Sequence, residues 1–189
     1  RVSRPRQERF QRMNEVAKLV ANRVLAAHQK VRFQKDITLA MEQTLLTLKN
    51  RQPTAKEIAF AKAVLSDQSP NPLPRLAEAY AHRTLALANG PREEEIVLQA
   101  LRLGEVGITS IPCEVLCEIG LTLKAQSPLA QSTFTIELAN GHYGYLPTPR
   151  QHALGGYETW MGTSILEILA SEKIKKSLLK MLGKVADSD

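Results

Sequence analysis

Cysteines, aromatic side chains and long apolar runs are all scarce in this sequence of 189 residues. Its two cysteines, Cys113 and Cys117, would share one face of a helix, a geometry that does not favour a disulfide. They could supply at most half of a structural zinc site, so we expect both to be core thiols. No apolar run approaches the roughly 20 residues that a membrane-spanning helix requires. The sequence also lacks an initiator Met, which indicates a piece of a longer protein whose leader cannot be judged.

Positive charge is concentrated at the start of the chain. Residues 1–35 contain ten lysines and arginines against two glutamates, Glu8 and Glu15, a net charge of +8 in a chain whose total is +6. A basic helix here could bind phosphate backbones or anionic lipid, or could simply turn a charged face to solvent. Aromatic residues make up 5% of the chain, and none forms a stacking platform between the basic residues. We therefore expect a solvated face and no binding to nucleic acid.

Apolar periodicity and turn residues predict alternating helices and strands. Helices are expected over residues 6–29, 54–65, 73–88, 113–126 and 172–183. Strands are expected over residues 37–48, over 95–111 as two strands around Gly104, and over 132–140. This order predicts an α/β fold in which a mixed β-sheet is layered with helices, and we treat residues 1–189 as a single domain.

Three local features refine these elements. Thr54 and Glu57 have the spacing of a capping box at the start of a helix. The run from Gln43 to Leu46 breaks the apolar alternation and suggests a bulge. Ser171 could cap the last helix.

Candidate chemistry lies where strands give way to helices or glycine-rich loops. Glu114 follows Pro112 at such a junction, either as a carboxylate that the helix dipole favours or as a metal ligand. Tyr145 and Tyr157 belong to ELANGHYGYLPTPRQHALGGYETW, residues 137–160, which holds three of the four tyrosines of the chain. Clustered tyrosines can be rim packing, or can offer phenol hydroxyls to a metal or an oxyanion. Spacing alone does not decide between these readings.

The segments IPCEVLCEIGL and ELANGHYGYLPTPRQHALGGYETW, with the strands that link them, resemble the C-terminal half of the catalytic domain of the neutral, non-lysosomal ceramidase-like family. The likeness is greatest to its shorter bacterial members. The resemblance implies part of a larger α/β hydrolase-type domain that uses zinc to hydrolyse the amide bond of an N-acyl sphingoid or similar lipid-like amide. It also favours an exported protein.

The resemblance assigns roles to three residues. Glu114 in Pro-Cys-Glu and Tyr145 in YLPTP match the zinc ligands of the family, and Tyr157 in YETW matches the tyrosine that stabilises the oxyanion. The two zinc histidines and the serine nucleophile of the family would lie in an upstream half, the expected partner of this chain. The histidines present here are interpreted as surface or packing residues: His28, His82, His142 and His152. On an extended backbone His142, three residues before Tyr145, would point to the opposite face. The chain alone is thus expected to be inactive.

Two other interpretations stay open. Cys113 and Thr159 both stand where the family has glycine, which would suit a non-catalytic binding or structural module on the same fold. Cys113 at a helix start would also have a lowered thiol pKa, as a redox protein requires, but its spacing to Cys117 is one residue longer than Cys-x-x-Cys.

Overall fold

A computed structural model describes residues 8–66, 76–129 and 132–188. The chain divides into two compact units, Arg1–Ile37 and Thr38–Asp189. The first contains one helix, α1 (Gln11–His28), within the predicted range 6–29, whose first two residues lie outside the described ranges. None of its residues is buried. Among the described residues, no helix combines the length and apolar character that a membrane span needs.

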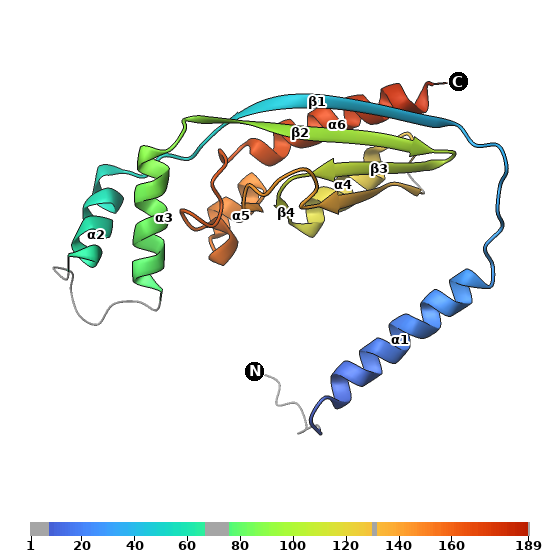
Figure 1. The fold of residues 1–189 in the computed structure, drawn as a ribbon, viewed down its shortest axis with the longest axis horizontal. Coiled ribbons are helices and arrows are strands. Elements are labelled where there is room, and N and C mark those ends of the chain that lie inside the picture. Colours follow the sequence, from blue (N-terminus) through green and yellow to red (C-terminus); the bar gives the residue numbers. More distant parts are fainter. Residues whose placement is uncertain (1–7, 67–75, 130–131, 189) are drawn as a thin grey trace. The chain divides into compact units, whose positions relative to one another are not determined.

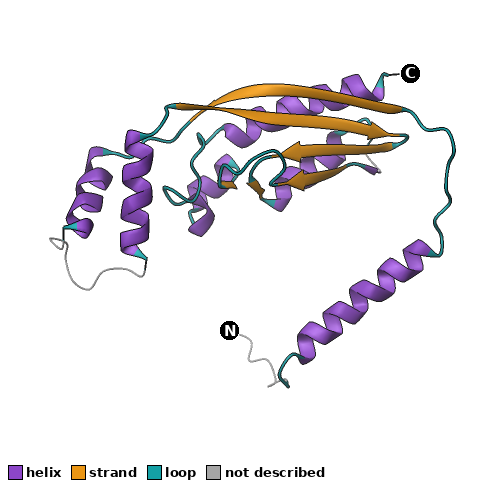
Figure 2. Ribbon diagram, viewed as in Figure 1, coloured by secondary structure: helices purple, strands orange, loops and turns teal. Residues whose placement is uncertain are grey.

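The second unit is built on a mixed sheet of four strands, confirming the predicted fold class (Figure 2). Its spatial order is β1 (Leu39–Lys49), β2 (Glu93–Leu103), β3 (Val106–Ile111) and β5 (Phe134–Glu137). Strands β1, β2 and β3 pair antiparallel, and β3 pairs parallel with β5. The prediction of two strands within residues 95–111 is confirmed, with Gly104 at φ 61° in the turn.

The predicted bulge in the first strand is wrong. Pairing between β1 and β2 is unbroken from Leu39 opposite Leu103 to Lys49 opposite Glu93. The apolar alternation fails because the two faces of the sheet both carry apolar residues, with Leu45 on one face and its neighbour Leu46 on the other.

One face of the sheet holds the core. Helix α6 (Ala170–Ala186) contacts β1, β2 and β3, and α4 (Cys117–Gln126) contacts α6 and β5 (Figure 1). The centre of this layer consists of fully buried aliphatic side chains from sheet and helices, among them Ile96, Leu98, Ile111, Ile119, Ile174, Leu178 and Leu182.

Two predicted helix starts are wrong. Helix α6 begins at Ala170, so Ser171 lies inside it as a fully buried residue and not as its cap. Helix α4 begins at Cys117 and not at residue 113, because Glu114 and Val115 form a short strand, β4. The Val115 amide is therefore outside the helix and donates a hydrogen bond to the Glu137 carboxylate at 2.9 Å.

The other face of the sheet is partly apolar, and several of its residues are exposed in the part of the chain that the structure describes. Pairing aligns Met41, Leu101, Ile108 and Phe134 in one row across all four strands. Met41 and Phe134 are 58% and 49% exposed. Further exposed apolar residues on this face are Leu39, Leu45, Leu103 and Ile136. We call these residues and the row the outer sheet face.

Two antiparallel helices, α2 (Ala55–Leu65) and α3 (Ala77–Asn89), lie beside one end of the sheet (Figure 1). The predicted capping box is present: the Thr54 side chain accepts from the Glu57 amide, and the Glu57 carboxylate accepts from the Thr54 amide. Predicted helix residues 73–75 lie outside the described ranges. The remaining elements, β6 (Tyr145–Leu146), α5 (Pro149–Leu154) and the 3-10 turn η2 (Tyr157–Thr159), form the segment around the site.

The core layer supports a stability prediction. Replacing Leu178 by Ala should lower the free energy of unfolding by about 2–5 kcal/mol, because the fully buried side chain leaves a cavity between helix and sheet. The matched change of exposed Lys180, two residues along the same helix, should stay within about 0.5 kcal/mol. Urea unfolding measures both, and equal losses would contradict this assignment of the core.

Candidate functional site

The site is built on a pair of two-residue parallel strands. In the pairing of β4 with β6, Glu114 lies directly beside Tyr145 although 31 positions separate them in sequence. The amide of Glu114 donates to the Gly144 carbonyl, and the amide of Tyr145 donates to the Thr163 carbonyl, both at 3.0 Å. Neighbours in register project from the same side of a sheet, so this pairing brings the two predicted metal ligands together.

Gly144 makes this pairing possible. It has φ 73°, and a Cβ built on it would lie 2.4 Å from the carbonyl oxygen of Thr163. A side chain would therefore meet backbone that must stay in place to hold Tyr145. The close approach of residue 144 to the Thr163 carbonyl therefore requires glycine at position 144.

The Glu114 carboxylate favours the protonated form of the Tyr145 phenol. A hydrogen bond to the carboxylate, followed by partial desolvation and its negative charge, raises the pKa of the Tyr145 phenol to about 12. The phenol therefore holds its proton at neutral pH while the carboxylate beside it accepts. An adjacent phenol and carboxylate offer two oxygen donors on one surface.

His142 also reaches this surface, which the sequence reasoning missed. Its Nε2 lies 3.5 Å from Oε1 of Glu114, and its side chain is 67% exposed. An extended backbone would have turned His142 and Tyr145 to opposite faces. Residues 141–143 are not a strand, however, and Gly144 turns the chain, so the expected separation does not occur.

Tyr157 completes the set of predicted residues. The chain turns through Gly155 and Gly156, at φ 76° and 120°, into the η2 turn that starts with Tyr157. Its ring meets the Tyr145 ring edge-on, with centroids 5.8 Å apart. Glu114, Tyr145 and Tyr157 thus line one cavity of about 310 Å³, together with His142 and Arg83. The structure brings the three predicted residues together; their roles stay predictions.

Helix α3 contributes two residues that no sequence signal identified. The Tyr80 hydroxyl bonds to the Thr163 hydroxyl at 2.8 Å, and the Arg83 guanidinium lies 5.1 Å from the Tyr80 ring centroid. Hydrogen bonding with Tyr80 is the main cause of a raised pKa at Tyr157, and Arg83 acts in the opposite direction. Both residues sit in an ordinary amphipathic helix, where nothing in the spacing marks them.

The described residues supply only part of the usual set of zinc ligands. The described ranges contain no group of three or more His, Cys, Asp and Glu side chains arranged to hold a metal ion. The adjacent carboxylate and phenol of Glu114 and Tyr145 fit two oxygen positions of a mixed nitrogen and oxygen site. The carboxylate and the phenol are oxygen donors of a kind that zinc accepts, and the described residues alone do not complete a zinc site.

The two departures from the family pattern are accommodated. Cys113 is fully buried and, unlike Leu138 and Asn140, does not have a positive φ, so its side chain causes no backbone strain. The Thr159 hydroxyl donates to the Gly156 carbonyl at 2.8 Å and closes the η2 turn. Neither residue occupies the cavity.

Comparisons with known proteins rest on the fold. No family model and no curated sequence matches the chain. A crystal structure of neutral ceramidase from Pseudomonas aeruginosa superposes on 96% of this chain with a TM-score of 0.58 and 15% identity. The chain has the fold of part of a neutral ceramidase. It spans 34% of the length of that protein.

A second solved structure, described as a ceramidase complexed with C2, covers 49% of this chain and 15% of its own, with a TM-score of 0.43 and 15% identity. That likeness is too partial to support an argument. The superposition over 96% of the chain confirms the expected resemblance at the level of the fold.

The cysteines differ from each other, and only one matches the expectation of two core thiols. Both are free, with Cys113 buried and Cys117 exposed. Burial raises the pKa of the Cys113 thiol to about 12. A hydrogen bond to Glu118 raises the pKa of Cys117. Neither thiol has the lowered pKa that a redox pair requires, and no helix begins at Cys113.

Thiol labelling tests this difference. In the native chain, one equivalent of a maleimide should react, at Cys117, while Cys113 should react only after denaturation because it is inaccessible and protonated. Mass spectrometry of the labelled peptides distinguishes the two positions. Equal labelling of both thiols under native conditions would contradict the buried position of Cys113.

Proposed function

We propose that this chain is the C-terminal part of a zinc-dependent amide hydrolase that cleaves an N-acyl sphingoid or similar N-acyl amide. The observation that supports it is the registered pair Glu114 and Tyr145, which shares one cavity with Tyr157. Three residues that the resemblance identifies in two separate segments line one cavity, on a fold that superposes on neutral ceramidase. The substrate class comes from that neighbour and belongs to the proposal.

Glu114 and Tyr145 would hold zinc together with histidines from the upstream half. Zinc so held would act as a Lewis acid toward the amide carbonyl. The Glu114 carboxylate favours the protonated form of the Tyr145 phenol, whereas a bound cation would favour its deprotonation.

Tyr157 supplies a donor. A phenol is protonated at neutral pH, and hydrogen bonding with Tyr80 raises the pKa of Tyr157 further, so its hydroxyl can donate to the oxygen that gains charge as the amide is attacked. Arg83 lines the same cavity and adds positive charge on that side. A fixed donor aimed at developing charge lowers the barrier more than it strengthens substrate binding.

The missing donors require a partner, and the outer sheet face offers a surface for it. Exposed apolar residues there lie on β1, β2 and β5, from Leu39 to Ile136, and Ile108 of β3 is half-buried between them, an apolar extent that indicates an interaction surface. The chain spans about a third of the length of the neutral ceramidase that it resembles. We assign this face to the upstream half of the parent protein.

A non-catalytic module on the same fold is the alternative. It is favoured by the incomplete donor set among the described residues. The parent protein decides between the two: a hydrolase binds stoichiometric zinc and cleaves amides, and a module does neither.

Replacing Glu114 by Ala in the parent protein should abolish most hydrolysis of an N-acyl amide and reduce bound zinc, because one oxygen ligand is lost. The isolated chain should bind zinc weakly and hydrolyse nothing. Metal analysis of the purified protein and an amide-cleavage assay measure both effects.

Glu118→Ala is the matched control, since this exposed carboxylate lies outside the cavity. It should keep both zinc and activity. Full zinc content in the Glu114→Ala parent would rule out Glu114 as a ligand.

Tyr157→Phe in the parent should lower kcat by about 10²–10³ with a small change in KM, as loss of an oxyanion donor does. Tyr143→Phe, a matched change outside the cavity, should leave kcat unchanged. Steady-state kinetics separates the two parameters. A Tyr157→Phe enzyme with normal kcat would remove the hydroxyl from the mechanism.

A further inference from the structure

His142 lines the cavity of Glu114 but has no part in the resemblance, which places the zinc histidines upstream. It precedes Tyr145 by three residues, and Gly144 turns the chain between them. Its imidazole lies against the Glu114 carboxylate although 28 positions separate the two residues in sequence. A nitrogen donor thus stands beside the two oxygen donors of the site.

Two backbone hydrogen bonds fix His142 opposite Glu114. The Tyr143 amide donates to the Pro112 carbonyl at 2.9 Å, and the Glu114 amide donates to the Gly144 carbonyl at 3.0 Å. Residues 142–144 are therefore held alongside residues 112–114, next to the parallel pairing of β4 with β6. Both side chains are attached to backbone that contacts within this chain hold in place, as a preorganised metal site requires.

The distance between the imidazole and the carboxylate suits an ion bound by both. His142 Nε2 lies 3.5 Å from Glu114 Oε1, which is longer than the usual hydrogen bond of about 2.7–3.2 Å between nitrogen and oxygen. Two ligand atoms that bind one tetrahedral zinc ion at about 2.0–2.2 Å lie about 3.3–3.5 Å apart. The two atoms are therefore spaced as neighbouring ligands of one ion, with Tyr145 directly beside Glu114 as a third donor.

The charge of Glu114 is available to a metal ion. Within the described ranges Glu114 forms no ion pair with a lysine or an arginine, Arg83 of the same cavity included. The side chain of His142 is 67% exposed and that of Glu114 is 33% exposed. The open side at His142 leaves space for water or a further ligand, which zinc needs to reach four ligands.

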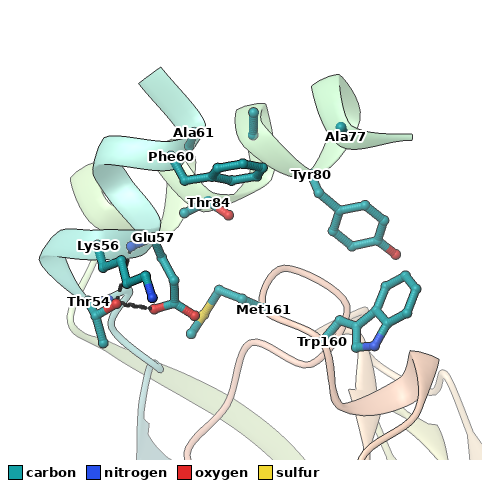
Figure 3. A pocket seen from close by; sticks show the side chains of 11 residues that line it. Thr54, Lys56, Glu57, Phe60, Ala61, Ala77, Tyr80, Thr84, Trp160 and Met161 are labelled. Carbon is teal, nitrogen blue, oxygen red and sulfur yellow. Dashed lines mark hydrogen bonds between the residues drawn. The ribbon is translucent and has the colours of Figure 1, made fainter. Parts of the chain in front are cut away.

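A larger groove elsewhere in this unit lacks such a combination of donors. It lies between α2, α3 and the loop that follows η2, and its volume is about 680 Å³ (Figure 3). Its described lining residues include no histidine or cysteine. The carboxylate among them, Glu57, accepts from the amide and the hydroxyl of Thr54, at 2.7 and 2.8 Å. A metal ion is therefore expected at the cavity of Glu114 and not in this groove.

We propose that His142 is a metal ligand, so that Glu114, His142 and Tyr145 bind one zinc ion from within this chain. The inference rests on the proposed function, which assigns Glu114 and Tyr145 to zinc. It adds a nitrogen donor that the resemblance does not contain. The imidazole also sets the selectivity, because imidazole suits zinc, whereas magnesium and calcium prefer oxygen ligands.

Metal binding can be measured on the isolated chain without turnover, by titration with Zn²⁺ and with Co²⁺, whose visible absorption reports its ligands. The weak binding expected of this chain should involve one ion per chain, and Mg²⁺ should not compete. His142→Ala should weaken the binding of both metals about tenfold or more, since even the loss of a residue that only orients a ligand costs about that much. Zinc should also shift the imidazole NMR signals of His142.

His82→Ala is the matched control, because His82 is an exposed residue of α3 outside the cavity. It should bind both metals as the unmodified chain does. Far-UV circular dichroism checks that both variants keep their secondary structure. No Co²⁺ binding by the unmodified chain, equal binding by the His142→Ala chain, or an ion shared between two chains would overturn the inference.

The parent protein separates this inference from the proposed function. If the parent cleaves amides while His142→Ala leaves the metal affinity of the isolated chain unchanged, the inference fails and the proposed function stands. If the isolated chain binds zinc through His142 while the parent cleaves no amide, the proposed function fails and the metal site stands.

Discussion

Close backbone packing around Gly144 holds the candidate site together. Its carbonyl accepts from Glu114, and its Cα lies so near the carbonyl of Thr163 that a Cβ would be 2.4 Å from that oxygen. The same segment is tied to the end of β3 by a hydrogen bond from the Tyr143 amide to the Pro112 carbonyl, at 2.9 Å. The segments at Glu114, Tyr145 and Thr163 thus meet at Gly144, where the lack of a side chain lets their backbones approach. Displacing any of them would separate Glu114 from Tyr145.

Local sequence rules predicted the fold where the interactions are local. The capping box at Thr54 and the turn at Gly104 involve neighbours in sequence, and both are present. The start of α6 was missed because Ser171 is buried by tertiary packing, which no capping rule contains. The strand at Glu114 was missed because its partner is 31 residues away. Helix α5 could have been found, since Thr148 and Gln151 form the same capping box with Pro149 after the cap.

In the site, too, the sequence identified some residues, whereas others are brought in only by tertiary contacts. Glu114, Tyr145 and Tyr157 were identified by resemblance, and spacing alone left their chemistry open. Tyr80 and Arg83 enter the site because α3 lies against the loop after η2, an arrangement that only the tertiary structure specifies. Tyr80 of this helix therefore raises the pKa of Tyr157, and Arg83 lines one side of the cavity.

The position of the site relative to the core explains how part of a site can be organised within this chain. The core between sheet and α6 is complete, with Ile174 and Leu178 fully buried. The site lies beyond the end of β3, where glycine turns and backbone hydrogen bonds, and not a shared apolar centre, fix the side chains. Glu114 keeps a third of its side-chain surface in solvent, so its charge is hydrated without a metal. Backbone contacts within this chain thus hold the Glu114 carboxylate and the Tyr145 phenol side by side.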